Sequence, residues 1–135
     1  TAIPRVTFTD PEIAHVGMSE AEARTSHRQL RILRWPYAEN DRAQAERKTD
    51  GHIKIVADRR GRILGVSIVG ANAGEMIAMW ALAVSKRMRV GDIANLVFPY
   101  PTFSEIGKRA AIAYFSPATR RPAVRRLIRF LRIFG

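Results

Sequence analysis

The segment of this sequence best suited to chemistry spans residues 98–105 (FPYPTFSE), where two prolines flank a tyrosine and a glutamate follows five positions later. A phenol with a pKa near 10 keeps its proton at neutral pH and donates a hydrogen bond, whereas a carboxylate accepts one. Tyr100 and Glu105 are therefore candidate catalytic residues. A structural interpretation stays open beside this one, because Thr102 and Glu105 have the spacing of a capping box and Pro101 favours extended backbone before a helix.

Thiol and metal sites lack the residues that they need. The sequence contains no cysteine, which excludes a thiolate nucleophile, a redox-active cysteine pair, a zinc–thiolate site and an iron–sulfur cluster within this chain. Its three histidines are His15, His27 and His52. They show neither an i, i+4 nor an HxH spacing, so no metal site is predicted.

Residues 69–75 (VGANAGE) lie between a predicted strand and a predicted helix, which is where a nucleotide-binding unit has its phosphate-binding loop. The segment matches neither GxGxxG nor GxxxxGK, and Glu75 would place a negative charge where a phosphate should bind. We therefore interpret it as a tight strand-to-helix turn with Asn72 as the helix cap and Glu75 at the matching position.

Hydrophobic patterning predicts the elements that position these residues. Strands are expected at residues 6–9, 13–18 and 30–37, and the segments 52–58 and 63–69 form the clearest antiparallel hairpin. The polar residues 38–50 are expected to form a loop with one helical turn, and Ser19 begins a short helix through a capping box.

Helices are expected mainly in the second half of the chain. One buried helical stripe is predicted after Gly70, formed by Met76, Met79, Trp80, Ala83 and Val84. A short turn of helix follows at residues 91–96, and a second long helix is expected at residues 102–115. Strands that precede helices indicate the α+β class, an antiparallel sheet flanked by helices.

Length and charge suit a single globular domain with an unusual end. The chain has 135 residues and a net charge of +11, of which six positive charges come from arginines in residues 117–135, leaving +5 for everything before them. The longest apolar run, residues 76–84, is far shorter than the ~20 residues of a membrane-spanning helix. The abrupt start in extended sequence suggests a piece of a longer protein.

Three separated segments together indicate a family. They are PRVTFTDPEIAHVGMSEAEA near the start, TDGHIKIVADRRGRILGVSIVGANAGEMI in the middle and FPYPTFSEIGKRAA late in the chain. In this order they resemble the C-terminal dimerisation domain of the flavin-dependent pyridine nucleotide-disulfide oxidoreductases, the group of dihydrolipoamide dehydrogenase, glutathione reductase and mercuric reductase. The resemblance covers about residues 1–115. We therefore divide the chain into a dimerisation domain, residues 1–116, and a basic amphipathic tail, residues 117–135.

The resemblance implies a homodimer in which each subunit's last domain completes its partner's active site. It implies that FAD and NAD(P) bind to the upstream flavin and nicotinamide domains of the full-length enzyme, so none is expected in this fragment, which should be inactive alone. It also brings hydrophobic candidates for the dimer contact: Phe98, Phe103, Met79 and Trp80. Burial in the core explains Met79 and Trp80 equally well.

The late motif departs from the family at one position. Most members begin it with a histidine, the acid–base group of thiol chemistry, and end it with a glutamate five residues on; Tyr100 and Glu105 match these positions. The resemblance places Tyr100 and Pro101 against the partner subunit's flavin, with Tyr100 as a hydrogen-bond donor or substrate contact and Glu105 orienting it or capping the helix. An imidazole titrates near pH 6.5, unlike a phenol, so an acceptor other than an ordinary dithiol is expected.

Tyrosine at this position is similar to mercuric reductase, in which the family places a tyrosine near the metal-binding thiols. Mercuric reductase also has a cysteine pair at its C-terminus, and this chain has no cysteine. The sequence is therefore interpreted as a mercuric-reductase-like relative with a different electron acceptor.

The tail leaves a second hypothesis open. Apolar residues recur at helical spacing between its arginines, which predicts a basic amphipathic helix. Such a helix could dock on an anionic membrane surface or a partner, or pack on the domain, while nucleic acid is the least favoured ligand. The alternative to the enzyme is thus a non-catalytic basic binding module, and the expected location is cytoplasmic, with membrane association through the tail.

Overall fold

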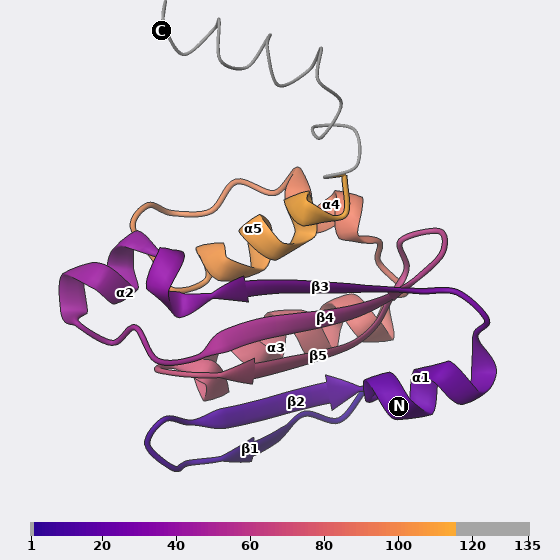
Figure 1. The fold of residues 1–135 in the computed structure, drawn as a ribbon, viewed down its shortest axis with the longest axis horizontal. Helices are drawn as coiled ribbons and strands as arrows, with labels where there is room; N and C mark the ends of the chain where they lie inside the picture. The colour runs from indigo at the N-terminus through magenta and orange to yellow at the C-terminus, as the bar shows by residue number, and fades with distance from the viewer. Residues whose placement is uncertain (1, 116–135) are drawn as a thin grey trace, which may run out of the picture.

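The computed structural model describes residues 2–115, and the predicted tail at 117–135 lies outside the described residues. Its centre is a five-stranded sheet in the order β1-β2-β5-β4-β3, in which every neighbouring pair is antiparallel (Figure 1). The strands are β1 (Arg5–Thr7), β2 (Ile13–Gly17), β3 (Leu30–Pro36), β4 (His52–Asp58) and β5 (Ile63–Val69). The predicted α+β class and the predicted β4–β5 hairpin are confirmed.

The turn between β4 and β5 is closed by the side chain of Asp58. Its carboxylate accepts hydrogen bonds from the backbone N–H groups of Arg60 and Arg62, each at 2.9 Å. Because successive side chains of a strand point to opposite faces, Ile53 and Ile55 face the main core while Val56 belongs to a second cluster. The apolar runs of this hairpin therefore provide buried side chains on both faces of the sheet.

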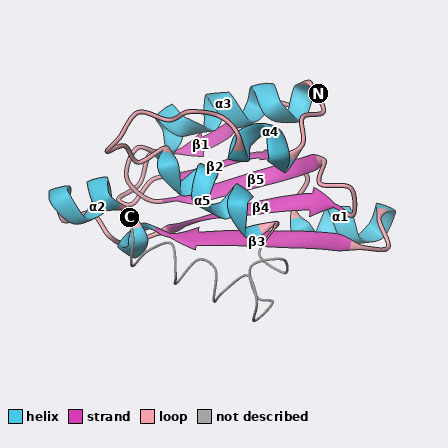
Figure 2. Ribbon diagram, turned by 90° about the horizontal axis from the view of Figure 1, so that it is seen from above, coloured by secondary structure: helices cyan, strands magenta, loops and turns pink. Residues whose placement is uncertain are grey.

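The helices lie on both faces of the sheet, and three of them form a layer over one face. They are α1 (Glu20–Ser26), the 3-10 helix η1 (Tyr37–Glu39), α2 (Asp41–Glu46), α3 (Ala73–Ser85), α4 (Val90–Ala94) and α5 (Glu105–Ala113). Figure 2 shows α3, α4 and α5 over the same face, where they enclose the main core. Helix α1 covers part of the opposite face, where Ala23 packs with Val56 and Leu64.

Helix α3 buries most of its predicted stripe. Met76, Trp80 and Ala83 are buried as expected, whereas Met79 and Val84 are only half-buried. Helix α5 meets the Trp80 ring at Gly107, where an added Cβ would lie 2.4 Å from the ring carbon Cζ2. Because Gly107 has no side chain, the first turn of α5 can pack directly against the Trp80 ring.

Several predicted details are wrong in position. The segment 38–50, expected as a loop with one turn, contains α2 and the last two residues of η1. The last helix begins at Glu105 instead of 102, because the Thr102 hydroxyl donates to the Pro99 carbonyl rather than capping a helix. Asn72 does precede α3, but in the left-handed conformation (φ 62°) and without a side-chain capping bond.

The turn before α3 is set by close packing. Gly70 has φ 150°, and an added Cβ there would lie 2.3 Å from the Tyr37 ring. The turn therefore belongs to the core, in agreement with its interpretation as a strand-to-helix connection. Among the described residues, no helix combines the length and the apolar character needed to cross a membrane.

Candidate functional site

The candidate site is the segment between α4 and α5, with Tyr100 and Pro101 on the surface. The Tyr100 side chain is 71% exposed, and the peptide bond that joins it to Pro101 is cis. Two residues later Phe103 is buried, with its ring centroid 5.8 Å from that of Tyr37. Tyr37 is fixed in turn by a hydrogen bond of 2.7 Å from its hydroxyl to the Ala71 carbonyl. The exposed Tyr100 thus lies only three residues before Phe103, whose side chain is fixed in the core.

Glu105 caps the start of α5. Its carboxylate accepts a hydrogen bond of 3.1 Å from the backbone N–H of Thr102, which is one half of the predicted capping box. The other half is absent: the Glu105 N–H donates to the Thr102 backbone carbonyl at 3.4 Å, and the Thr102 hydroxyl donates to the Pro99 carbonyl at 2.8 Å. Of the two roles expected for Glu105, orienting Tyr100 or capping the helix, the hydrogen bond corresponds to the second.

The hydroxyl of Tyr100 donates to a residue that sequence analysis missed. It lies 2.6 Å from Oδ2 of Asp41, the first residue of α2. The hydrogen bond to Asp41 and that residue's charge raise the pKa of the Tyr100 phenol, and the charge of Glu105 adds to the effect. The phenol therefore keeps its proton at neutral pH.

The buried residue Asn40 ties α2 to the same segment. Its side-chain Oδ1 accepts from the backbone N–H of Ala43 at 2.9 Å and so caps α2, while its Nδ2 donates to the Thr102 carbonyl at 3.0 Å. An asparagine at the start of a polar stretch is a recognisable helix-cap signal. Nothing in the local sequence indicates that its second bond reaches Thr102.

Two cavities adjoin this region. One of about 310 Å³ lies beside the segment, lined by Pro101, Thr102 and Phe103 together with Arg42 of α2 and Glu75 of α3. It is half-open to solvent and carries charges of both signs. Pro101 of the Tyr100–Pro101 step therefore borders this cavity, whereas Tyr100 is not one of its lining residues.

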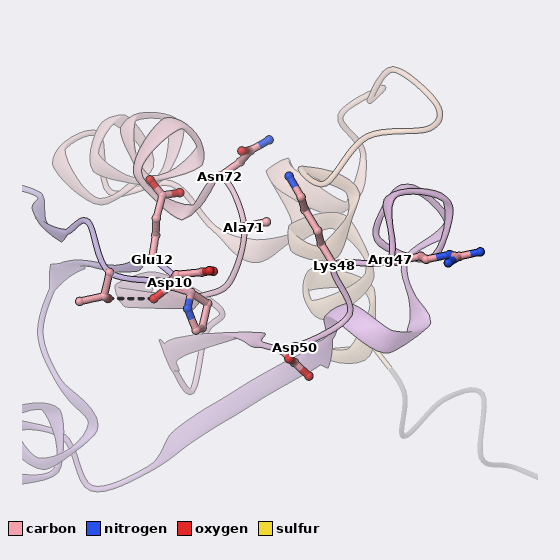
Figure 3. Close-up of a pocket in the computed structure, with 9 residues that line it drawn as sticks. Asp10, Glu12, Arg47, Lys48, Asp50, Ala71 and Asn72 are labelled. Atoms are coloured by element: carbon pink, nitrogen blue, oxygen red, sulfur yellow. Dashed lines mark hydrogen bonds between the residues drawn. The ribbon is translucent and has the colours of Figure 1, made fainter.

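The larger cavity, of about 550 Å³, has no lining residue from the segment 98–105 (Figure 3). Acidic Asp10, Glu12 and Asp50 line it with basic Arg47 and Lys48, and in Figure 3 the Arg47 side chain points away from the opening. Residues 2–115 contain no cluster of three or more histidine, aspartate or glutamate side chains suited to hold a metal ion. The cavity's mixed charge indicates no particular ligand.

Two of the predicted dimer-contact residues are core residues. Trp80 is 2% exposed and Phe103 is 6% exposed, so neither is available at the surface of the chain. Met79 and Phe98 are half-buried and pack against the same core. Large apolar side chains are exposed in the loop before Tyr100, at Leu96 and Val97, and at the C-terminal end of α5, at Ile112 and Phe115.

A family of known proteins matches most of the chain. The model of the dimerisation domain of the pyridine nucleotide-disulphide oxidoreductases covers residues 3–111. The chain belongs to this family. The dimerisation domain described here is 40% identical over 117 residues to dihydrolipoamide dehydrogenase of Chaetomium thermophilum, covering 86% of this chain and 23% of that protein. It is 41% identical over 111 residues to dihydrolipoyl dehydrogenase of Geobacillus stearothermophilus, covering 82% of this chain and 24% of that protein.

Solved structures of flavoproteins share the fold. LpdA from Mycobacterium tuberculosis aligns with a TM-score of 0.77 at 31% identity over 83% of this chain and 25% of its own. The Cu(II) complex of the HOCl-induced flavoprotein disulfide reductase RclA from Escherichia coli gives 0.79 at 26% identity over 83% and 26%. The dimerisation domain thus spans about a quarter of the length of these relatives. Their names support the family and give no support to a mercuric-reductase-like subgroup.

Proposed function

We propose that this domain belongs to a larger FAD- and NAD(P)-dependent oxidoreductase and completes the active site of a partner subunit in a homodimer. The observation that supports the proposal is the geometry of the Tyr100–Pro101 step. Tyr100 is exposed and donates a hydrogen bond to Asp41, and the neighbouring Thr102 accepts one from Asn40. A step built in this way can present the same surface to a second subunit each time the two associate. Its position in the chain is the one at which the family resemblance places the contact with the partner's flavin.

The residues at the step suit the face of a flavin. Tyr100 offers an aromatic ring and Pro101 an apolar ring, both exposed, without a nearby exposed lysine or arginine in the segment 98–105. When bound in the upstream domains, the flavin and nicotinamide would supply hydride and electron transfer. This chain would contribute apolar contact, through Pro101, and a protonated hydroxyl, through Tyr100.

Exposed apolar side chains in the loop before the step and at the end of α5 support a contact between two copies of the chain. Leu96 is 44% and Val97 87% exposed, while Ile112 and Phe115 of the α5 region are 41% and 46% exposed. Burial of such side chains favours association by about 25 cal/mol per Å² of apolar surface. Light scattering across a concentration series tests this contact directly. An interface that forms between two copies of this chain alone gives twice the monomer mass, and a persistent monomer contradicts such an interface.

Tyr100 also bears on the electron acceptor. Its phenol, with a pKa raised by Asp41, cannot exchange a proton near pH 7 as an imidazole does. We infer that the enzyme reduces an ordinary disulfide slowly and uses another acceptor. Only the tyrosine at position 100 favours the mercuric-reductase-like subgroup.

The Tyr100→His variant of the full-length enzyme tests the proposed site. Reduction of oxidised lipoamide to the dithiol takes two electrons and two protons, which NADH and one proton from solvent supply. If residue 100 occupies the acid–base position, histidine there should raise lipoamide turnover at least tenfold, which is a small part of the about 10²- to 10⁴-fold typical of general acid–base catalysis. Tyr100→Phe is the matched control without a titratable group, and a Tyr100→His rate no higher than this control contradicts the proposal.

The basic binding module remains an alternative without a structural observation in its favour. It depends on residues 117–135, which lie outside the described part of the chain. Docking of this tail on an anionic membrane surface and the expected cytoplasmic location stay predictions.

A further inference from the structure

The proton of the Tyr100 hydroxyl is already engaged within the chain. A phenol carries one O–H donor, and that of Tyr100 points at Oδ2 of Asp41 at 2.6 Å. A hydrogen bond to an ionised carboxylate is among the stronger kinds. The tyrosine is therefore a donor, as expected, but its donor serves Asp41 and not a molecule outside the chain.

Asp41 is itself held in place relative to Tyr100. It follows Asn40, whose buried side chain caps α2 and also donates to the Thr102 carbonyl at 3.0 Å. Two consecutive residues of the α2 start thus contact positions 100 and 102 of the late segment. Because both contacts come from one helix end, the carboxylate and the phenol are held together although they are 59 positions apart in sequence.

Other described residues do not duplicate this contact. The Glu105 carboxylate is engaged by the Thr102 N–H at 3.1 Å, so it acts on the phenol only through its charge. Tyr100 is 71% exposed, which leaves few packing contacts to fix its ring. Asp41 is consequently the group that can set the direction of the phenol.

We infer that Asp41 is a positioning residue for Tyr100, which fixes the ring and accepts the hydrogen bond of its O–H group, so that the phenol presents oxygen lone pairs, not a donor, to the partner subunit. The inference rests on the proposed function of the Tyr100–Pro101 step. A group with a hydrogen-bond donor, such as a thiol or a protonated acceptor, is then the kind of partner that the step accommodates. The raised pKa of the phenol agrees with this arrangement.

Ultraviolet titration of tyrosine ionisation tests the contact in the 135-residue chain. The chain has three tyrosines, and subtraction of the Tyr100→Phe titration isolates the transition of Tyr100. We expect Asp41→Asn to lower the pKa of Tyr100 toward the ordinary value of about 10. Asp50→Asn is the control, since it removes the same charge at an exposed position whose carboxylate has no hydrogen bond or ion pair with another described residue. An unchanged pKa in Asp41→Asn overturns the inference.

The full-length holoenzyme provides a second readout in the Tyr100→His background. If Asp41 orients residue 100, adding Asp41→Asn should reduce the gain in lipoamide turnover at least threefold, whereas Asp50→Asn should leave it intact. A gain that persists in full without Asp41 overturns the positioning role. Failure of Tyr100→His to raise turnover contradicts the proposed function alone, and the tyrosine titration then decides on Asp41 by itself.

Discussion

Replacement of Asn40 by alanine should loosen the support behind the candidate site. Asn40 is 4% exposed and makes two hydrogen bonds, one as acceptor from the Ala43 N–H and one as donor to the Thr102 carbonyl. Alanine can make neither bond. The variant therefore removes the cap of α2 and separates α2 from the segment that carries Tyr100.

The expected loss of stability follows from these two bonds. Loss of an asparagine N-cap costs about 1 kcal/mol. A carbonyl left without its donor costs about 1–3 kcal/mol when buried, and Thr102 is half-buried, so the lower part of that range applies. We expect Asn40→Ala to lower the free energy of unfolding by about 2–3 kcal/mol.

Urea unfolding of the 135-residue chain, followed by the fluorescence of the tryptophans, measures this loss. Asn95→Ala is the control, because Asn95 is exposed and its side chain makes no hydrogen bond with another described residue; it should stay within about 0.5 kcal/mol of wild type. Equal stability of Asn40→Ala and Asn95→Ala would refute the reasoning.

Asn40→Asp separates the two bonds of the same side chain. Aspartate keeps the acceptor for Ala43 but turns a carboxylate toward the Thr102 carbonyl. Burial beside that carbonyl should raise the folded-state pKa of the new carboxyl, so the native state binds more protons than the unfolded one. The stability deficit relative to wild type should therefore shrink as the pH falls from neutral, whereas that of Asn40→Ala should not.

Two further variants test the packing and the charges of the fold. Gly107→Ala places a Cβ 2.4 Å from the Trp80 ring and should cost about 1–2 kcal/mol in urea unfolding after the helix-propensity gain, whereas Gly91→Ala, with 3.7 Å to its nearest neighbour, should be neutral or stabilising. Glu20→Gln removes a carboxylate whose pKa is lowered to about 2 by Lys54 and Arg24. The stabilisation from this carboxylate is fully present above pH 4.3 and is lost as the pH falls toward 2. The loss of unfolding free energy in the variant should therefore be larger at pH 6 than at pH 2.5, and equal losses at the two pH values contradict the prediction.

The elements of the fold could be predicted because each depends on local pattern. The β4–β5 hairpin and the stripe of α3 bury residues at the periods of a strand and a helix, and Ser19 caps α1 through a hydrogen bond of 3.1 Å from the Glu22 N–H. The family was recognisable for a related reason, since three segments in a fixed order carry more information than one. What depended on periodicity and short motifs was therefore accessible from sequence.

Helix α2 was predicted only as a single helical turn within a loop, because its local signals are weak. It is six residues long and buries only Ala43, so it shows no apolar period. The N3 position after the Asn40 cap is alanine, which removes the glutamate that would complete a capping box. Stability of such a short helix comes from its tertiary contacts, here the bond from Asn40 to Thr102.

The support of the candidate site was hidden for a different reason. Tyr100 and Glu105 were chosen from their residue types and spacing. They do not hydrogen-bond to each other: Tyr100 donates to Asp41, and Glu105 accepts from the Thr102 N–H. The partner of Tyr100 lies 59 residues away in sequence. No local spacing rule describes a contact between a helix start and a distant loop.

A carboxylate acts in opposite ways on an imidazole and on a phenol. Beside a histidine, whose unperturbed pKa is near 6.5, a carboxylate favours the charged form and raises a pKa that stays within reach of neutral pH. Beside Tyr100 the same charge raises a pKa that already lies near 10, so the phenol becomes a poorer proton source as well as a fixed one. The pair of Asp41 and Tyr100 therefore holds a proton where a histidine would exchange it. Chemistry at this step must then draw its protons from the incoming molecule, the partner subunit or solvent.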